Sequence, residues 1–105
     1  MKTDTGVGLI ATERKRQIEK VGWTPDHDAN HREGELSLAA MCYAAPSAAC
    51  IGQGTPSHWP WDSMWWKPSN HIRNLVKAGA LIAAEIDRLQ RKEQAGIDGA
   101  KGGTQ

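Results

Sequence analysis

The first residues with chemical potential form a segment rich in histidines and acids, DHDANHREGE, at residues 26–35. His27, His31 and Glu35 recur every four residues, so a helix through this segment would place all three on one face. Two imidazoles and a carboxylate that converge in this way can hold a divalent metal ion with one position open for water. Asp28 completes the predicted metal set as a further ligand or as the partner of a ligand. Alternatively, these residues cap helices, or the histidines hydrogen-bond a phosphate or a ribose.

The second group is WPWDSMWWKP at residues 59–68, which holds four of the chain's five tryptophans, while the chain has no phenylalanine. Indole faces stack on nucleobases, which contributes ~1–3 kcal/mol per base. Lys67 in this segment, with Arg73 and Lys77 just beyond it, would supply positive charge for a phosphate. The alternative is that the indoles fill the core of a small bundle, and we expect this for at least two of the four.

The third group is the charged stretch ERKRQIE at residues 13–19. Free guanidinium groups at Arg14 and Arg16 would form a phosphate clamp. A solvated helix face, or a buried structural ion pair, is the alternative for the same residues. The predicted ligand-binding set is Arg14, Arg16, Trp23, His27, Trp61, Trp65, Trp66, Lys67, Arg73 and Lys77.

Three predicted helices must position these groups. The first spans residues 4–20 and carries a narrow apolar stripe that includes Val7 and Ile10, and the main second helix follows a capping-box pattern at residues 30–33 and ends before Pro46. The third begins after a cap at Ser69 and spans residues 69–94. The predicted fold is therefore all-α: a small three-helix, bundle-like domain over residues 1–95, with a long Trp- and Pro-rich loop at residues 46–68 between the second and third helices. Residues 96–105 are predicted to be a flexible, glycine-rich tail.

The third helix has a second role. Its apolar residues follow alternating spacings of three and four, which is typical of a coiled-coil seam: Ile72, Leu75, Gly79, Ile82, Ile86 and Leu89. We therefore expect a homo-oligomer that forms through the 69–94 helix.

The bulk composition limits the classes of partner. The chain has 105 residues, enough for one domain, and its 13 basic and 12 acidic residues give a net charge of +1, which argues against DNA as a partner. No apolar stretch approaches the ~20 residues that span a bilayer, and the N-terminal segment lacks the apolar region of a signal peptide. We therefore expect a cytoplasmic protein with no membrane contact, in which Cys42 and Cys50 are free thiols.

Five ordered blocks of the sequence are similar to a family of small proteins of tailed bacteriophages and prophages. The blocks are ERxRQI, GWTPxHD, HxxGEL, WPWxxxWWKP and RNLVKAGALI, and the resemblance covers residues 9–91. Family members usually carry a second Asp where this chain has Ala29, and an acid where it has Val21. The resemblance implies a phage setting, and so the cytoplasm of an infected bacterial host, but no particular activity.

These observations support three hypotheses about function. The first is a phage accessory protein that binds, and so sequesters, a nucleotide-type ligand such as a host defence signal. The second is an interaction module that binds and inhibits a host protein through its tryptophans. The third is a metal-dependent nucleotide pyrophosphohydrolase, for which a divalent metal ion would be the cofactor. The sequence favours binding over catalysis.

Overall fold

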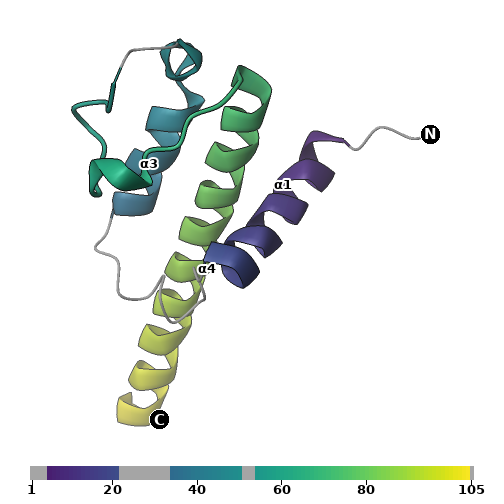
Figure 1. Ribbon diagram of the computed structural model, residues 1–105. Coiled ribbons are helices and arrows are strands. Elements are labelled where there is room, and N and C mark those ends of the chain that lie inside the picture. Colours follow the sequence, from purple (N-terminus) through teal and green to yellow (C-terminus); the bar gives the residue numbers. More distant parts are fainter. Residues whose placement is uncertain (1–4, 22–33, 51–53, 105) are drawn as a thin grey trace.

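The computed structural model describes residues 5–21, 34–50 and 54–104 (Figure 1). Helix α1 spans Gly6–Arg16 and continues as a π-helical turn, η1, at Gln17–Val21; α3 spans Glu35–Ala44 and α4 spans His71–Thr104. Two short 3₁₀ turns, η2 at Pro46–Ala49 and η3 at Ser63–Trp65, lie in the predicted loop. All regular structure in these ranges is helical, and three helices pack together, which confirms the predicted all-α, three-helix domain.

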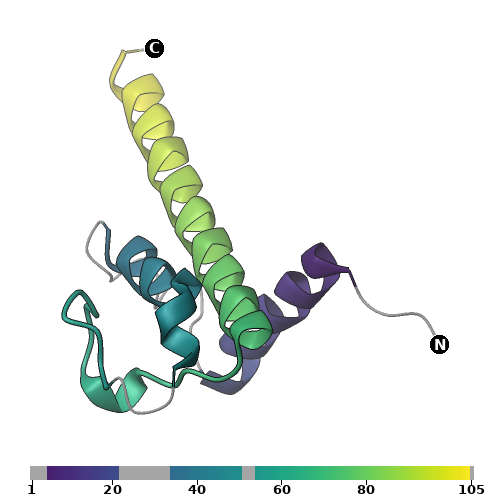
Figure 2. The ribbon, with the colours of Figure 1, turned by 90° about the horizontal axis from the view of Figure 1, so that it is seen from above.

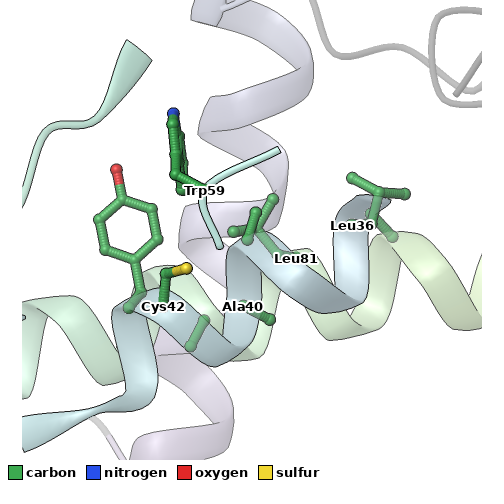
Figure 3. Packing of buried hydrophobic residues seen from close by; sticks show 9 residues of the cluster. Leu36, Ala40, Cys42, Trp59 and Leu81 are labelled. Atoms are coloured by element: carbon green, nitrogen blue, oxygen red, sulfur yellow. The ribbon is translucent and has the colours of Figure 1, made fainter. Parts of the chain in front are cut away.

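Helix α4 is the axis of the molecule, with α3 packed on one side and α1 crossing it on another (Figures 1 and 2). The contact between α3 and α4 uses small side chains, because Ala39 on α3 and Ala84 on α4 are completely buried in the shared core. Small residues let the two helix backbones approach closely. Leu36 and Leu81 fill the space between the helices, and Trp59 from the loop closes one end of the core (Figure 3).

Helix α1 docks through a face that is mostly polar. Where α1 meets α4, Ile10 rests on Gly79, and a Cβ atom added at Gly79 would overlap the Ile10 side chain. The apolar stripe predicted for α1 is wrong at its first residue, since Val7 is 80% exposed. Glu13 and Gln17 are instead the buried residues, at 1% and 3% exposure. They follow Ile10 at helical spacing. Glu13 accepts a hydrogen bond from Arg73 of α4 and another from Gln17, so polar contacts rather than hydropathy set this part of the buried face.

The start of α4 is fixed by two asparagines. The side chain of Asn70, and not the predicted Ser69, caps the helix, because Asn70 Oδ1 accepts a hydrogen bond of 2.8 Å from the Arg73 amide. Asn74 is completely buried and holds the backbone of residue 69 on both sides. Its Oδ1 accepts from Ser69 N at 2.6 Å and its Nδ2 donates to Ser69 O at 2.9 Å. The exit of the loop is thereby fastened to the first turns of α4.

The rest of α4 differs from the prediction in length but not in pattern. The helix continues to Thr104 instead of ending at Gln94. Within the predicted seam, Gly79 is covered by α1, whereas the five larger residues are between 37% and 71% exposed: Ile72, Leu75, Ile82, Ile86 and Leu89. The core uses the neighbouring small-residue face of α4. None of the helices in the described ranges has the length and apolar character needed to cross a membrane.

Candidate functional site

The centre of the candidate site is the buried carboxylate of Glu13. Arg16 Nε and Nη2 donate to its two oxygens, each at 2.8 Å, and Gln17 Nε2 donates at 3.2 Å. From α4, Arg73 Nη2 donates to the same carboxylate. Burial pushes the pKa of Glu13 upward, but the hydrogen bond from Arg16 and the charges of Arg73 and Arg16 outweigh it, so the pKa lies below its ordinary value. Glu13 is therefore an ionised anchor that fixes two guanidinium groups.

Glu13 does not accept from all of the N–H donors of these two guanidinium groups. The Arg16 side chain is 43% exposed and the Arg73 side chain is 37% exposed, whereas the Glu13 side chain is 1% exposed. An arginine has five N–H donors in a planar fork, and Glu13 takes only some of them. Both guanidinium groups are therefore partly exposed to solvent, and their hydrogen bonds to Glu13 fix their orientation.

Lys77 adds a third cation one helical turn beyond Arg73. Its Nζ donates to the Lys67 carbonyl oxygen at 2.6 Å. Burial lowers the pKa of Lys77, and the charges of Arg73, Arg16 and Lys67 lower it further, while Glu13 is the one group that raises it. In the described part of the chain, the surroundings of Lys77 thus hold more positive than negative charge. We call Glu13, Arg16, Gln17, Arg73 and Lys77 the Glu13 cluster.

An aromatic wall borders the Glu13 cluster. Tyr43, in the last turn of α3, lies with its ring 4.6 Å from that of Trp66 at an angle of 30°, and Lys77 Nζ lies 5.5 Å from the Tyr43 ring centre. The Tyr43 hydroxyl accepts a hydrogen bond of 3.0 Å from the Lys67 amide, which leaves its own proton to donate. Burial raises the pKa of Tyr43, so this proton is retained at neutral pH.

The tryptophans divide between core and surface. Trp59 is 8% exposed, its Nε1 donates to Asp62 O at 3.1 Å, and its ring meets those of Trp61 and Trp66 at 5.3 and 4.9 Å. Trp61 and Trp66 are partly buried against the core, whereas Trp65 is 46% exposed. The expectation that at least two indoles pack in the core is confirmed.

Gln17 supplies the one unusual acceptor of the cluster. It begins η1, and single π-helical turns occur frequently at functional sites. Because the ionised Glu13 carboxylate can only accept, the Gln17 amide must turn Nε2 toward it, and Oε1 is directed away. Gln17 Oε1 is buried and has no hydrogen-bond partner in the described structure. Such an oxygen costs about 1–3 kcal/mol unless a donor reaches it.

The structure brings part of the predicted ligand-binding set together and separates the rest. Five of its residues gather around Glu13 and Tyr43: Arg16, Trp66, Lys67, Arg73 and Lys77. Arg14 lies elsewhere, with a side chain that is 11% exposed and an Nη2 atom 3.8 Å from Asp87 Oδ2. The Asp87 side chain is 49% exposed, so this is a partly exposed pair between α1 and α4 that lies outside the Glu13 cluster. Trp23 and His27 lie outside the described residues.

The predicted metal set is described at only one position. His27, Asp28 and His31 lie outside the described residues, and Glu35 is the first residue of α3. The residue before it, Gly34, has a φ of 91°, which is a left-handed conformation that interrupts an α-helix. Helix α3 therefore begins at Glu35, directly after Gly34, and the shared face predicted for His27, His31 and Glu35 stays a prediction because the two histidines lie outside the described residues. Within the described ranges, no three His, Cys, Asp or Glu residues are grouped so that they could hold a metal ion.

Four residues that shape the site were missed from sequence. Glu13 and Tyr43 contact the cations, Gln17 donates to Glu13, and Asn74 fixes the loop beside them. The spacing of Ile10, Glu13 and Gln17 was the available signal, because residues three and seven positions beyond a packed isoleucine share its face. No protein-family model, curated protein or solved structure matches the chain. The chemistry of the Glu13 cluster is therefore the guide to what this protein binds.

Proposed function

We propose that the protein is a binding module for a nucleotide-type ligand, which is an anion joined to a planar ring. The protein binds this ligand without catalysing its conversion. One observation carries this proposal: a buried, ionised Glu13 orients Arg16 and Arg73 beside Lys77, and the resulting excess of positive charge borders the Tyr43 ring. Donors that are fixed before binding lose little entropy when an anion arrives. Bidentate arginine is also the common protein partner of phosphate.

Two further groups match a nucleotide better than a bare inorganic anion. The Tyr43 hydroxyl keeps a proton to donate, and Gln17 Oε1 is a buried acceptor with no described partner. A ligand that has both phosphate oxygens and a hydroxyl or amide donor would use all of these groups. Catalysis is disfavoured because the cluster's carboxylate, Glu13, is ionised and receives four hydrogen bonds, so it is a poor general base.

Sequestration of a host signalling nucleotide would fit the phage setting that the sequence blocks imply. A second candidate function is binding of a host protein, which is supported by Met64 and Trp65. These adjacent loop residues are 65% and 46% exposed, and tryptophan is enriched among the residues that dominate protein interfaces. Metal-dependent pyrophosphate hydrolysis is the third candidate, and it depends on His27, Asp28 and His31.

Calorimetry with a panel of nucleotides tests the proposal. The panel comprises linear mono-, di- and triphosphates and cyclic mono- and dinucleotides, with inorganic phosphate and uncharged nucleosides for comparison. Lys77→Gln should weaken binding by about ten- to a hundredfold, because a charge-assisted contact is worth ~1.5–3 kcal/mol. Lys92→Gln is the matched control, since it removes the same charge about 22 Å further along α4 at ~1.5 Å per residue.

Two outcomes would overturn the proposal. The first is a lack of affinity for every nucleotide on the panel, and capture of a specific host protein in the same preparation would then favour the second candidate. The second is recovery of a hydrolysed ligand after incubation with Mg²⁺ or Mn²⁺, which would identify an enzyme.

We also propose that two copies of the chain associate through the exposed seam of α4. Ile82, Ile86 and Leu89 are half to one-third exposed, and they lie below the point where α1 covers Gly79. The lower half of α4 also extends past α3 and α1 (Figure 1). A second copy of the same helix has the matching pattern of apolar residues to cover this face.

A further inference from the structure

A pocket of about 810 Å³ is lined by none of the residues of the Glu13 cluster, and the proposed function does not use it. Its walls come from the C-terminal half of α3, from η2 and from the loop that ends at Asn70. Its volume lies in the range of about 300–1,000 Å³ that is usual for small-molecule sites. Trp66 belongs to both places, since it stacks on Tyr43 and also lines the pocket.

The lining of the pocket is apolar and built from small side chains. Described residues that line it include Cys42, Ala45, Ala48, Ala49 and Gly54, which leave room beside the indole of Trp66. The described lining contains no Lys, Arg, Asp or Glu. The described lining thus has no permanently charged side chain to pair with a phosphate or carboxylate, and its one basic residue is the imidazole of His58. The occupant that fits this mostly apolar lining is uncharged.

One end of the pocket is polar, at the start of α4. Ser69 and Asn70 line it there, and their positions are fixed by the Asn74 clamp and the helix cap. The Asn70 side-chain oxygen already accepts from the Arg73 amide, which leaves the Asn70 Nδ2 hydrogens to donate. A ligand in the pocket would therefore present a hydrogen-bond acceptor to this end.

We propose that this pocket is a second binding site, which takes an uncharged, flat aromatic molecule with a carbonyl or ring-nitrogen acceptor at one edge. The ring stacks on Trp66, the small side chains of α3 and η2 accommodate its thickness, and Asn70 Nδ2 donates to its acceptor. The site is separate from the Glu13 cluster, because neither Arg16, Arg73 nor Lys77 lines it.

The test uses caffeine as the probe, since it is flat, neutral and carries two carbonyl acceptors. Titration is followed by amide chemical shifts in the full-length protein, and shifts are expected at Ala48, Ala49 and Asn70. Asn70→Asp keeps the helix cap but replaces the donor by a negative charge, and it should weaken binding about five- to tenfold, the value of one neutral hydrogen bond.

A second variant tests the wall of the pocket. Met41 lines the pocket and is 51% exposed, so Met41→Glu should be tolerated by α3 while it places a charge beside the ring and weakens binding. Leu38→Glu is the matched control, because Leu38 is also exposed on α3, at 39%, and is not among the pocket residues.

The proposal is overturned if caffeine causes no shifts up to millimolar concentration, or if Asn70→Asp and Met41→Glu both bind it as well as the unmodified protein. Shifts confined to Arg73 and Lys77, abolished by Lys77→Gln, would assign the probe to the Glu13 cluster and also overturn it. Failure of this site would leave nucleotide binding intact, because that is measured with charged ligands and lost on a different substitution.

Discussion

Replacement of Glu13 by glutamine tests the central claim that a buried carboxylate holds α1 on α4. The substitution preserves size and one acceptor oxygen but removes the charge that Arg16 and Arg73 share. Removal of one partner of a buried ion pair costs about 3–5 kcal/mol. Because the two guanidinium groups are 43% and 37% exposed and can be rehydrated, we expect a smaller loss of about 2–3 kcal/mol in the free energy of unfolding.

The assay is thermal and urea unfolding, followed by tryptophan fluorescence. For a domain of this size the expected loss corresponds to a fall in Tm of roughly 10–20 °C. Glu19→Gln is the control, since the Glu19 side chain is 52% exposed and lies 3.9 Å from Lys15, and it should change stability by less than about 0.5 kcal/mol. If Glu13→Gln is as stable as Glu19→Gln, the carboxylate does not hold the two helices together.

Glu13 should also affect how the free energy of unfolding changes at acid pH. The pKa of Glu13 is lower in the folded protein than its ordinary value of 4.5, so the folded state favours the ionised form. Its contribution is therefore complete above about pH 5 and is lost as the pH falls through the folded-state pKa. Glu13→Gln should remove this part of the pH dependence, and an unchanged acid limb would contradict the assignment.

Three further substitutions test the fold and the assembly. Gly79→Ala places a Cβ atom against Ile10, and we expect the free energy of unfolding, measured by chemical denaturation, to fall by about 1–2 kcal/mol. This is a net loss, because alanine itself favours a helix by ~1 kcal/mol over glycine. A more stable variant would show that α1 moves aside. Asn74→Ala removes both hydrogen bonds to residue 69, so the free energy of unfolding should fall by roughly 2–3 kcal/mol. If the Ser69 amide is as well protected from hydrogen exchange in the variant as in the unmodified protein, Asn74 does not fix the loop. Ile86→Glu should convert a dimer into a monomer in analytical ultracentrifugation, whereas Gln90→Glu should not; if the unmodified chain sediments as a monomer at all concentrations, self-association through α4 is wrong.

The helices were predictable because each has strong local signals. The third helix combined a regular apolar repeat with small residues, and the structure places both along α4. The end of that helix was misjudged because the glycines after Gln94 were taken as a stop, although glycine weakens a helix by only ~1 kcal/mol per residue. The cap was misassigned by one residue because both Ser69 and Asn70 are good capping residues.

The site was harder to predict, because its central residue breaks the rule that places charged residues outside. Glu13 looks like part of a solvated face, and its burial is compensated by Arg16 on the same helix and by Arg73, which is 60 positions away in the sequence. Arg73 and Lys77 were found from residue type alone, but their relation to Glu13 depends on how α1 crosses α4. Hydropathy carries no information about such a crossing, since it follows from the fit of Ile10 against Gly79.

The ring cluster of Tyr43, Trp59, Trp61 and Trp66 also provides an intrinsic circular dichroism signal for the attachment of the loop. Ring centres separated by 4.6–5.5 Å have strongly coupled electronic transitions, so their circular dichroism differs from that of isolated indoles. These rings join the loop to the last turn of α3, whereas the amide signal comes mainly from the helices. Melting curves recorded at the two kinds of transition would coincide if loop and helices separate together, and would diverge if the loop detaches first. The attachment of the loop can thus be followed without any label.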